Sequence, residues 1–151
     1  MTAQVLTLVL LLAPVVGFLI NGARFRSQNG ILAGIIGTLA STTSFVATAL
    51  LYKHLLSLPH EQREILVSFY NWTTIGDSKV NVSFMFDSIS ILMCLIITGV
   101  GSLIHMFSIG YMSHDERPAK YFAYLNLFLF NMLLLVTGSN LLVMFVGWEG
   151  V

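Results

Sequence analysis

Charged side chains are scarce in this chain of 151 residues: 9% are Asp, Glu, Lys or Arg, whereas 56% are hydrophobic. Soluble domains usually carry about 25% charged residues. Four long stretches hold no such charge at all: 1–23, 27–52, 88–114 and 121–148. Each exceeds the roughly 20 residues that a helix needs to cross a bilayer. Because a soluble bundle would place charges on its outer face every turn or two, we expect this chain to lie in lipid.

Cysteine is nearly absent, and the one cysteine, Cys94, stands among Ile, Leu and Met. A single cysteine excludes an internal disulfide and a cysteine cluster for metal, so a packing role is expected for it. The net charge is zero and no basic cluster is present, which argues against nucleic acid as a partner. The sequence also lacks a glycine-rich nucleotide loop and histidines paired at haem spacing. We therefore expect no redox centre, no catalytic nucleophile, no metal and no cofactor bound by this chain.

The apolar stretches predict an all-α membrane protein with about four complete transmembrane helices and the start of a fifth. Residues 1–151 would form a single membrane domain, with spans at approximately 3–20, 30–52, 87–111, 121–136 and, incomplete, 141–151. Twelve residues from Asn140 rise only about 18 Å, well short of the bilayer thickness. A membrane helix does not end there with unsatisfied backbone groups in lipid. The chain is therefore expected to be a fragment or a truncated reading frame.

Residues 53–86 collect charged residues and Pro59, which predicts an extramembrane loop between the second and third spans. The second half of this loop alternates, so that one face would carry Val80, Val82, Phe84 and Phe86, and the other Asn81, Ser83 and Met85. A period of two predicts a strand. Leu66–Trp72 is the expected partner, with Gly76-Asp77-Ser78 in the turn. The loop should therefore form a small β-hairpin lying on the membrane surface.

Two short turns carry the densest positive charge, one with Arg24 and Arg26 and the other with Arg117 and Lys120. The basic residues of the hairpin side are spread over a longer loop. Lys and Arg in short loops favour the cytoplasmic side, so the N-terminus is expected outside. A bacterial plasma membrane is the expected location.

Glu149 is the most informative candidate residue. It follows Asn140 by nine residues, about 13 Å along the axis of a helix, which places it near the bilayer midplane. A carboxylate at that depth is costly unless it is paired, hydrated or protonated. Desolvation raises the pKa of a carboxyl group and a nearby lysine lowers it, and a group between these influences can relay protons. The alternative, equally weighted from spacing alone, is a structural Glu149 paired to another helix or at the start of a soluble loop.

Two further residues are candidates for a proton path. His105 lies eighteen residues after Asp87, about 27 Å along their common helix, and so near the opposite interface. An interfacial histidine satisfied by water or backbone is the favoured interpretation, and a role at a proton entrance is the alternative. Asp87 suits a helix N-terminus, where free N–H groups favour a carboxylate, and could instead face ions at the outer surface.

Small and amide side chains on the spans are expected to hold helices together. Gly30, Gly34, Gly37 and Ser41 recur at spacings of three and four, which lets a neighbouring helix approach closely. Asn126 and Asn131 on the fourth span are interpreted as buried amides of the same kind.

Three segments resemble subunit L of proton-pumping NADH:quinone oxidoreductase, the respiratory complex I. They are 86–106, which runs from Phe86-Asp87-Ser88 to His105-Met106, then 122–128, and above all Gly147-Trp148-Glu149-Gly150-Val151. The resemblance covers nearly the whole chain and is strong from Trp72 onward. In the first two spans, only hydropathy and position match.

The resemblance implies a non-redox membrane subunit that moves protons while NADH, FMN, iron–sulfur clusters and quinone react in other subunits. It also implies other membrane subunits as partners and a surface hairpin. The glutamate on the family's fifth span corresponds to Glu149, whose lysine partner would lie on a later helix that this sequence does not contain. The sequence alone should therefore not pump. The alternatives are a subunit of a multisubunit Na⁺/H⁺ antiporter and a truncated, non-functional membrane fragment.

Overall fold

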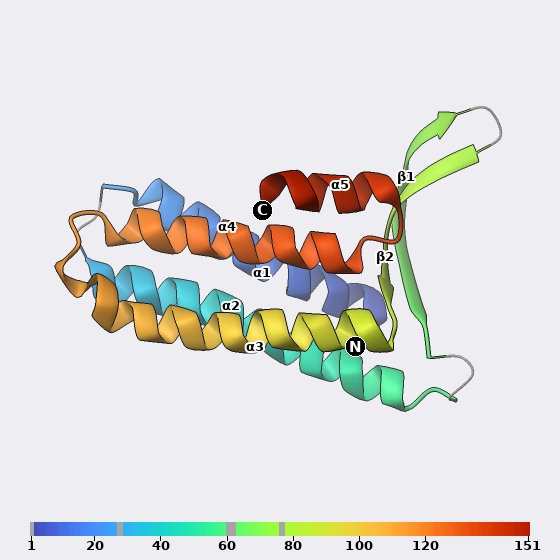
Figure 1. The fold of residues 1–151 in the computed structure, drawn as a ribbon, viewed down its shortest axis with the longest axis horizontal. Helices are drawn as coiled ribbons and strands as arrows, with labels where there is room; N and C mark the ends of the chain where they lie inside the picture. The colour runs from blue at the N-terminus through green and yellow to red at the C-terminus, as the bar shows by residue number, and fades with distance from the viewer. Residues whose placement is uncertain (1, 27–28, 60–62, 76–77) are drawn as a thin grey trace.

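Helices and one hairpin account for the fold in the computed structural model, which describes residues 2–26, 29–59, 63–75 and 78–151. The elements are α1 (Ala3–Ala23), α2 (Gly30–Leu56), β1 (Ile65–Ile75), β2 (Ser78–Phe86), α3 (Ser88–Tyr111), a short 3₁₀ turn η2 (Met112–His114), α4 (Pro118–Thr137) and α5 (Leu141–Gly150). Figure 1 shows the four long helices along a common axis, with the hairpin at one end and α5 folded back beside α4. The predicted fold class is confirmed.

The long helices have the character of membrane spans. Within the described residues, four helices are long and apolar enough to cross a bilayer: α1, α2, α3 with η2, and α4. Large apolar side chains such as Leu19, Ile31 and Phe107 are exposed on their outer faces. A soluble monomer rarely exposes so continuous an apolar surface, so lipid is the solvent that suits these faces.

Several helix ends lie beyond the predicted spans, such as Ala23 of α1, and two of them have a local reason. The helix α2 continues past residue 52 to Leu56 and carries Lys53 and His54 in its last turn, where cations interact favourably with the helix dipole. The helix α4 begins at Pro118 instead of residue 121. Proline is favoured at the first helical position because its missing N–H would have no intrahelical partner there.

Glycines on α2 allow α3 and α4 to approach it closely, because glycine has no side chain. The helix α1 packs on α2 and α4, and α2 also packs on α3. A Cβ atom at Gly34 would lie only 2.5 Å from the side chain of Ile109 on α3, and one at Gly37 would lie 3.2 Å from the ring of His105. The predicted ridge of small residues on the second span is therefore where α3 and α4 approach.

The base of the hairpin belongs to the core of the bundle. The strands β1 and β2 pair antiparallel, with Ile65 opposite Phe86 and Val67 opposite Phe84. These four side chains are buried in one cluster with residues of the helices, among them Leu10, Leu51, Cys94 and Leu133. The hairpin is therefore more than the predicted surface element, because its base closes one end of the bundle.

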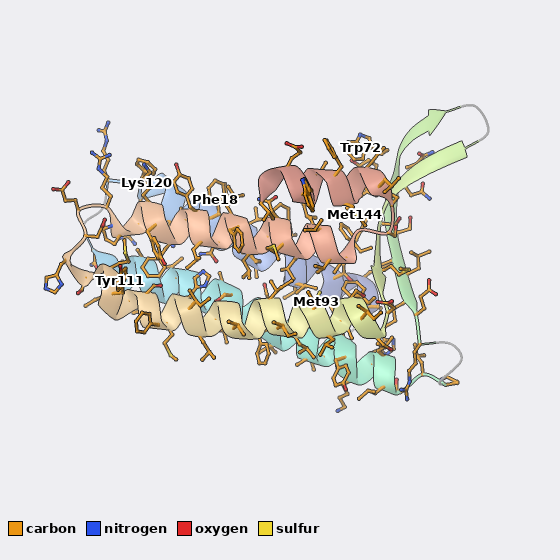
Figure 2. The ribbon with its side chains drawn as sticks, in the orientation of Figure 1. Phe18, Trp72, Met93, Tyr111, Lys120 and Met144 are labelled. Atoms are coloured by element: carbon orange, nitrogen blue, oxygen red, sulfur yellow. The ribbon has the colours of Figure 1, made fainter. Side chains whose placement is uncertain are left out.

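The outer part of the hairpin differs in character from its base. Tyr70 and Trp72 are exposed there, and Figure 2 labels Trp72 at the hairpin end of the molecule. The partner strand was predicted correctly, but two positions of the predicted turn, 76–77, lie outside the described residues.

Replacing Phe86 with Ala should lower the stability of the protein by about 3 kcal/mol or more, because a fully buried ring would leave a cavity where hairpin and helices meet. Leu66→Ala is the matched control, since Leu66 lies on β1 with its side chain exposed. Thermal unfolding in detergent measures both. Equal melting temperatures for the two variants would contradict the docking of the hairpin base.

Candidate functional site

The start of α5, the helix that carries Glu149, is fixed by one asparagine. The side-chain oxygen of Asn140 accepts hydrogen bonds from the backbone N–H groups of Leu142, at 3.1 Å, and Val143, at 3.0 Å. This is an N-cap, which satisfies donors that have no partner within the helix. The side-chain nitrogen of Asn140 donates to the carbonyl oxygen of Asn81 on β2 at 2.7 Å. One side chain therefore joins α5 to the hairpin.

The loop between α4 and α5 lies along β2 and strengthens this junction. Gly138 forms a single antiparallel bridge with Phe84. The backbone N–H and the hydroxyl of Ser139 both donate to the carbonyl oxygen of Ser83, at 3.1 and 3.0 Å, and the two serine hydroxyls are also hydrogen-bonded. The loop covers Ser83, which explains why this polar residue is buried although it lies on the face of β2 opposite to Phe84 and Phe86.

The helix α5 packs against α4 through two glycines. A Cβ atom at Gly147 would lie 2.5 Å from the backbone nitrogen of Leu135 and 2.9 Å from the carbonyl oxygen of Asn131. One turn further, Gly150 touches the side chain of Asn131, whose amide donates to the Gly150 carbonyl at 3.3 Å. Only a residue without a side chain fits at Gly147, because the contact is with backbone. Asn131 holds two helices together, as the sequence predicted.

This packing turns Glu149 away from α4. Gly147 and Glu149 are two residues apart, which separates them by about 200° around a helix of 3.6 residues per turn. Glu149 is exposed, and so is its neighbour Trp148. In the part of the chain that the structure describes, no hydrogen bond or ion pair engages the Glu149 carboxylate. The carboxylate therefore lies on the outer face of the bundle, on the last turn of α5. Figure 1 shows α5 ending beside α4, partway along the bundle.

His105 lies inside the bundle and not at its surface. Its side chain is only 1% exposed, and its Nδ1 is 2.7 Å from the carbonyl oxygen of Gly101. The ring lies near Phe122 of α4, with centroids 6.4 Å apart. Nε2 has no hydrogen-bond partner. The backbone thus provides a partner for one ring nitrogen only, and the place of His105 at the membrane interface or on a proton path stays a prediction.

Asp87 caps α3. Its side chain accepts from the backbone N–H of Ser90 at 2.7 Å, and the Ser90 hydroxyl accepts from the Asp87 N–H at 2.9 Å. This reciprocal pair is a capping box. The hydrogen bonds from Ser90 hold the pKa of the Asp87 carboxyl below its ordinary value. The geometry accounts for Asp87 as a cap, and its place on a proton path stays a prediction.

The three candidate residues do not form one constellation. Asp87 and His105 lie on the same helix, more than four turns apart, and Glu149 lies on α5. Among the described residues, no three His, Cys, Asp or Glu side chains gather in a group that could hold a metal ion. Sequence reasoning missed Asn140, whose signal was an asparagine directly before an apolar run.

Comparison with known proteins places the chain in a family. A family model described as the N-terminus of chain 5 of NADH-ubiquinone oxidoreductase (complex I) matches residues 72–122. Subunit L of the NADH-quinone oxidoreductase of Rhodobacter capsulatus is 37% identical over 155 aligned residues, which cover 97% of this chain and 21% of that protein. This chain belongs to the subunit L and chain 5 family of complex I.

Other members of the complex I family match shorter stretches. Chain 5 of Allomyces macrogynus is 51% identical over 80 residues, 53% of this chain and 12% of that protein. Subunit L of Mycobacterium tuberculosis is 39% identical over 117 residues, 78% of this chain and 18% of that protein. The chain thus spans about a fifth or less of the length of these relatives.

Within this complex I family member, Gly147→Leu should displace α5 from α4. The new side chain would meet backbone atoms of α4, which cannot move aside as a flexible side chain can, and overpacking typically costs about 1–3 kcal/mol. The expected result is a lower melting temperature in detergent. Val146→Leu adds bulk one position earlier on an exposed face and is the control. An unchanged melting temperature for Gly147→Leu would refute this packing.

Asp87→Asn should reduce stability at neutral pH by roughly 0.5 kcal/mol, because the amide still caps α3 but loses the favourable charge at the helix N-terminus. The pKa of Asp87 is lowered by folding, so its charge stabilises the protein above its ordinary value of 3.8 and ceases to do so as the pH falls through the lower folded value. The melting temperatures of the two proteins should therefore differ at pH 7 and converge in strong acid. A difference that stays constant with pH would contradict this role for the charge.

Proposed function

We propose that this chain forms part of a membrane subunit of NADH:quinone oxidoreductase that couples electron transfer elsewhere in the complex to proton translocation. One observation carries the proposal: Glu149 is the only acidic side chain within the five described α-helices. Ionisable residues inside membrane segments are rare and mark ion or proton pathways. The names of the relatives, which are subunits of NADH-quinone and NADH-ubiquinone oxidoreductases, favour the proton-coupled respiratory role.

The position of Glu149 suits a group that exchanges protons with a partner outside this chain. Its carboxylate faces away from α4, and a lysine on a further helix could approach it there. Movement of such a cation would change the proton affinity of the carboxyl group, because an opposite charge favours the ionised form. A proton would then be taken up or released with each movement and passed along hydrated side chains.

The partners in this proposal are other membrane subunits of the complex and the lipid bilayer. Besides Glu149, α5 exposes Leu141, Phe145 and Trp148, with exposed fractions of 80%, 58% and 68%. Such a surface is stable only against lipid or other apolar helices. This chain would bind no cofactor of its own, and NADH, FMN, iron–sulfur clusters and quinone would be held by other subunits.

The proposed orientation has the N-terminus outside, in the plasma membrane of a bacterium. The end opposite the hairpin is basic: the Lys120 ammonium lies 5.3 Å from the ring centre of Phe25 and 5.7 Å from that of Tyr124. Figure 2 labels Lys120 and Tyr111 at this end of the bundle. Basic residues in short loops favour the cytoplasmic side, which places the hairpin on the other side.

Glu149→Gln in the intact complex that contains this chain tests the proposed function. The variant should lower NADH-driven proton pumping severalfold, because an amide cannot take up or release a proton. Electron transfer from NADH to a soluble artificial acceptor should be unchanged, since it would occur in other subunits. Glu64→Gln makes the same chemical change just before β1 and is the control. Undiminished pumping by Glu149→Gln would refute the proposal.

A further inference from the structure

Four buried side-chain atoms among the described residues lack hydrogen-bond partners: Oδ1 of Asn21, Oγ1 of Thr38, Nε2 of His105 and Oδ1 of Asn126. The last two belong to neighbouring side chains, His105 and Asn126. The side chains are 1% and 0% exposed. They lie next to each other, on α3 and α4, since both side chains reach the same point beside Gly37 of α2. Buried polar groups in native proteins are nearly always hydrogen-bonded, so two adjacent exceptions require an explanation.

The hydrogen bonds that these two residues do make fix the roles of the remaining atoms. Nδ1 of His105 lies 2.7 Å from the carbonyl oxygen of Gly101, which can only accept, so Nδ1 carries a proton. The side-chain nitrogen of Asn126 donates to the Phe122 carbonyl at 3.0 Å, so its oxygen is left as an acceptor. A neutral imidazole has a single N–H. That N–H donates to the Gly101 carbonyl. Nε2 of His105 and Oδ1 of Asn126 are then two adjacent acceptors without a donor.

The neighbouring helices close over this pair with glycines. A Cβ atom at Gly37 of α2 would lie 3.1 Å from Nδ2 of Asn126 and 3.2 Å from Cδ2 of His105, and one at Gly17 of α1 would lie 3.0 Å from the amide of Asn126. Neither glycine offers a side-chain donor. The hydroxyl of Thr38, next to Gly37 on α2, is also without a partner and is bonded to neither acceptor. A donor can therefore come from the ring itself or from a small molecule.

A cavity of about 210 Å³ lies beside His105, between α3 and α4. His105 is the only polar side chain among its lining residues, which include Val100, Ile104, Leu125 and Phe128. By volume the cavity could hold a water molecule, the ordinary carrier of a proton, but its wall is apolar apart from the His105 ring.

We propose that His105 reversibly binds a proton, with the Gly101 carbonyl and the side-chain oxygen of Asn126 as the two acceptors that hold the doubly protonated ring. A hydrated proton transfers to Nε2: one O–H bond of the hydronium ion breaks, an N–H bond forms, and water remains. Release is the reverse. Asn126 is a positioning residue in this step. The inference rests on the proposed function, since it adds a second proton-binding group to the same translocation.

The other described groups around His105 are uncharged, so only the Gly101 carbonyl and the Asn126 oxygen would stabilise a positive charge on its ring. From α4 the ring meets Phe122 and Asn126, and α2 presents Gly37 to it, while Gly17 of α1 lies against Asn126. On α4, the hydroxyl of Tyr121 is hydrogen-bonded at 3.1 Å to Ser108, which follows His105 by three residues on α3. Within the described residues, no charged side chain acts on His105.

The pH dependence of NADH-driven proton pumping by the intact complex tests the proposal with paired variants. Asn126→Asp places a carboxylate beside Nε2, favours the charged ring, and should shift the His105-dependent limb of the profile by about one pH unit or more to higher pH. Asn126→Leu removes the acceptor and should shift it to lower pH. His105→Gln should lower pumping severalfold and abolish that limb. Thr98→Val, a buried change on the same face of α3, should leave the profile unchanged.

Opposite shifts for the two Asn126 variants support the proposal. The same profile for both, or wild-type pumping and profile for His105→Gln, overturns it. Should Asn126→Asp fail to assemble, the shift to lower pH in Asn126→Leu decides, and an unshifted profile overturns the proposal. Normal pumping by His105→Gln together with lost pumping by Glu149→Gln refutes this inference alone. Normal pumping by Glu149→Gln refutes the proposed function.

Discussion

The structure depends on one constraint: lipid supplies no hydrogen bonds, so the polar groups of the spans must find partners within the protein. Buried threonines on the helices meet it locally, since Thr48, Thr98 and Thr137 each donate to the carbonyl oxygen four residues earlier. At the hairpin end, Asp87 and Asn140 cap the helices that begin there. The same constraint makes the unpartnered atoms of His105 and Asn126 conspicuous, because nearly every other buried side chain obeys it.

Much of the fold could be predicted because lipid imposes a simple pattern. Long runs without charge gave the helices, and period-two alternation gave β2 and its partner. The position of Glu149 on a fifth helix also followed from sequence and helix geometry. What could not be predicted depends on contacts between distant residues. Ser83 lies on the polar face of β2 and is nevertheless buried, because a loop 56 residues later covers it.

At the candidate site, too, local features could be predicted from the sequence and contacts between distant residues could not. The sequence identified Glu149, His105 and Asp87 as the polar residues to consider, but not which of them interact. Capping by Asp87 is local and could be foreseen from the serine three residues later. The pairing of His105 with Asn126 could not, because it requires α3 and α4 to meet in a particular register. Glycines on α1 and α2 bring the helices close enough for that register to matter.

Asn140 uses both ends of its amide, one on the first turn of α5 and the other on β2. The hairpin and the first turn of α5 are therefore joined through one side chain and should move together. A tilt of the hairpin on one side of the membrane cannot leave the beginning of α5 in place without breaking this link. Through a rigid helix of ten residues, the same tilt changes the depth of the carboxylate at its far end. A subunit that binds the hairpin would thus be coupled mechanically to the helix that carries Glu149.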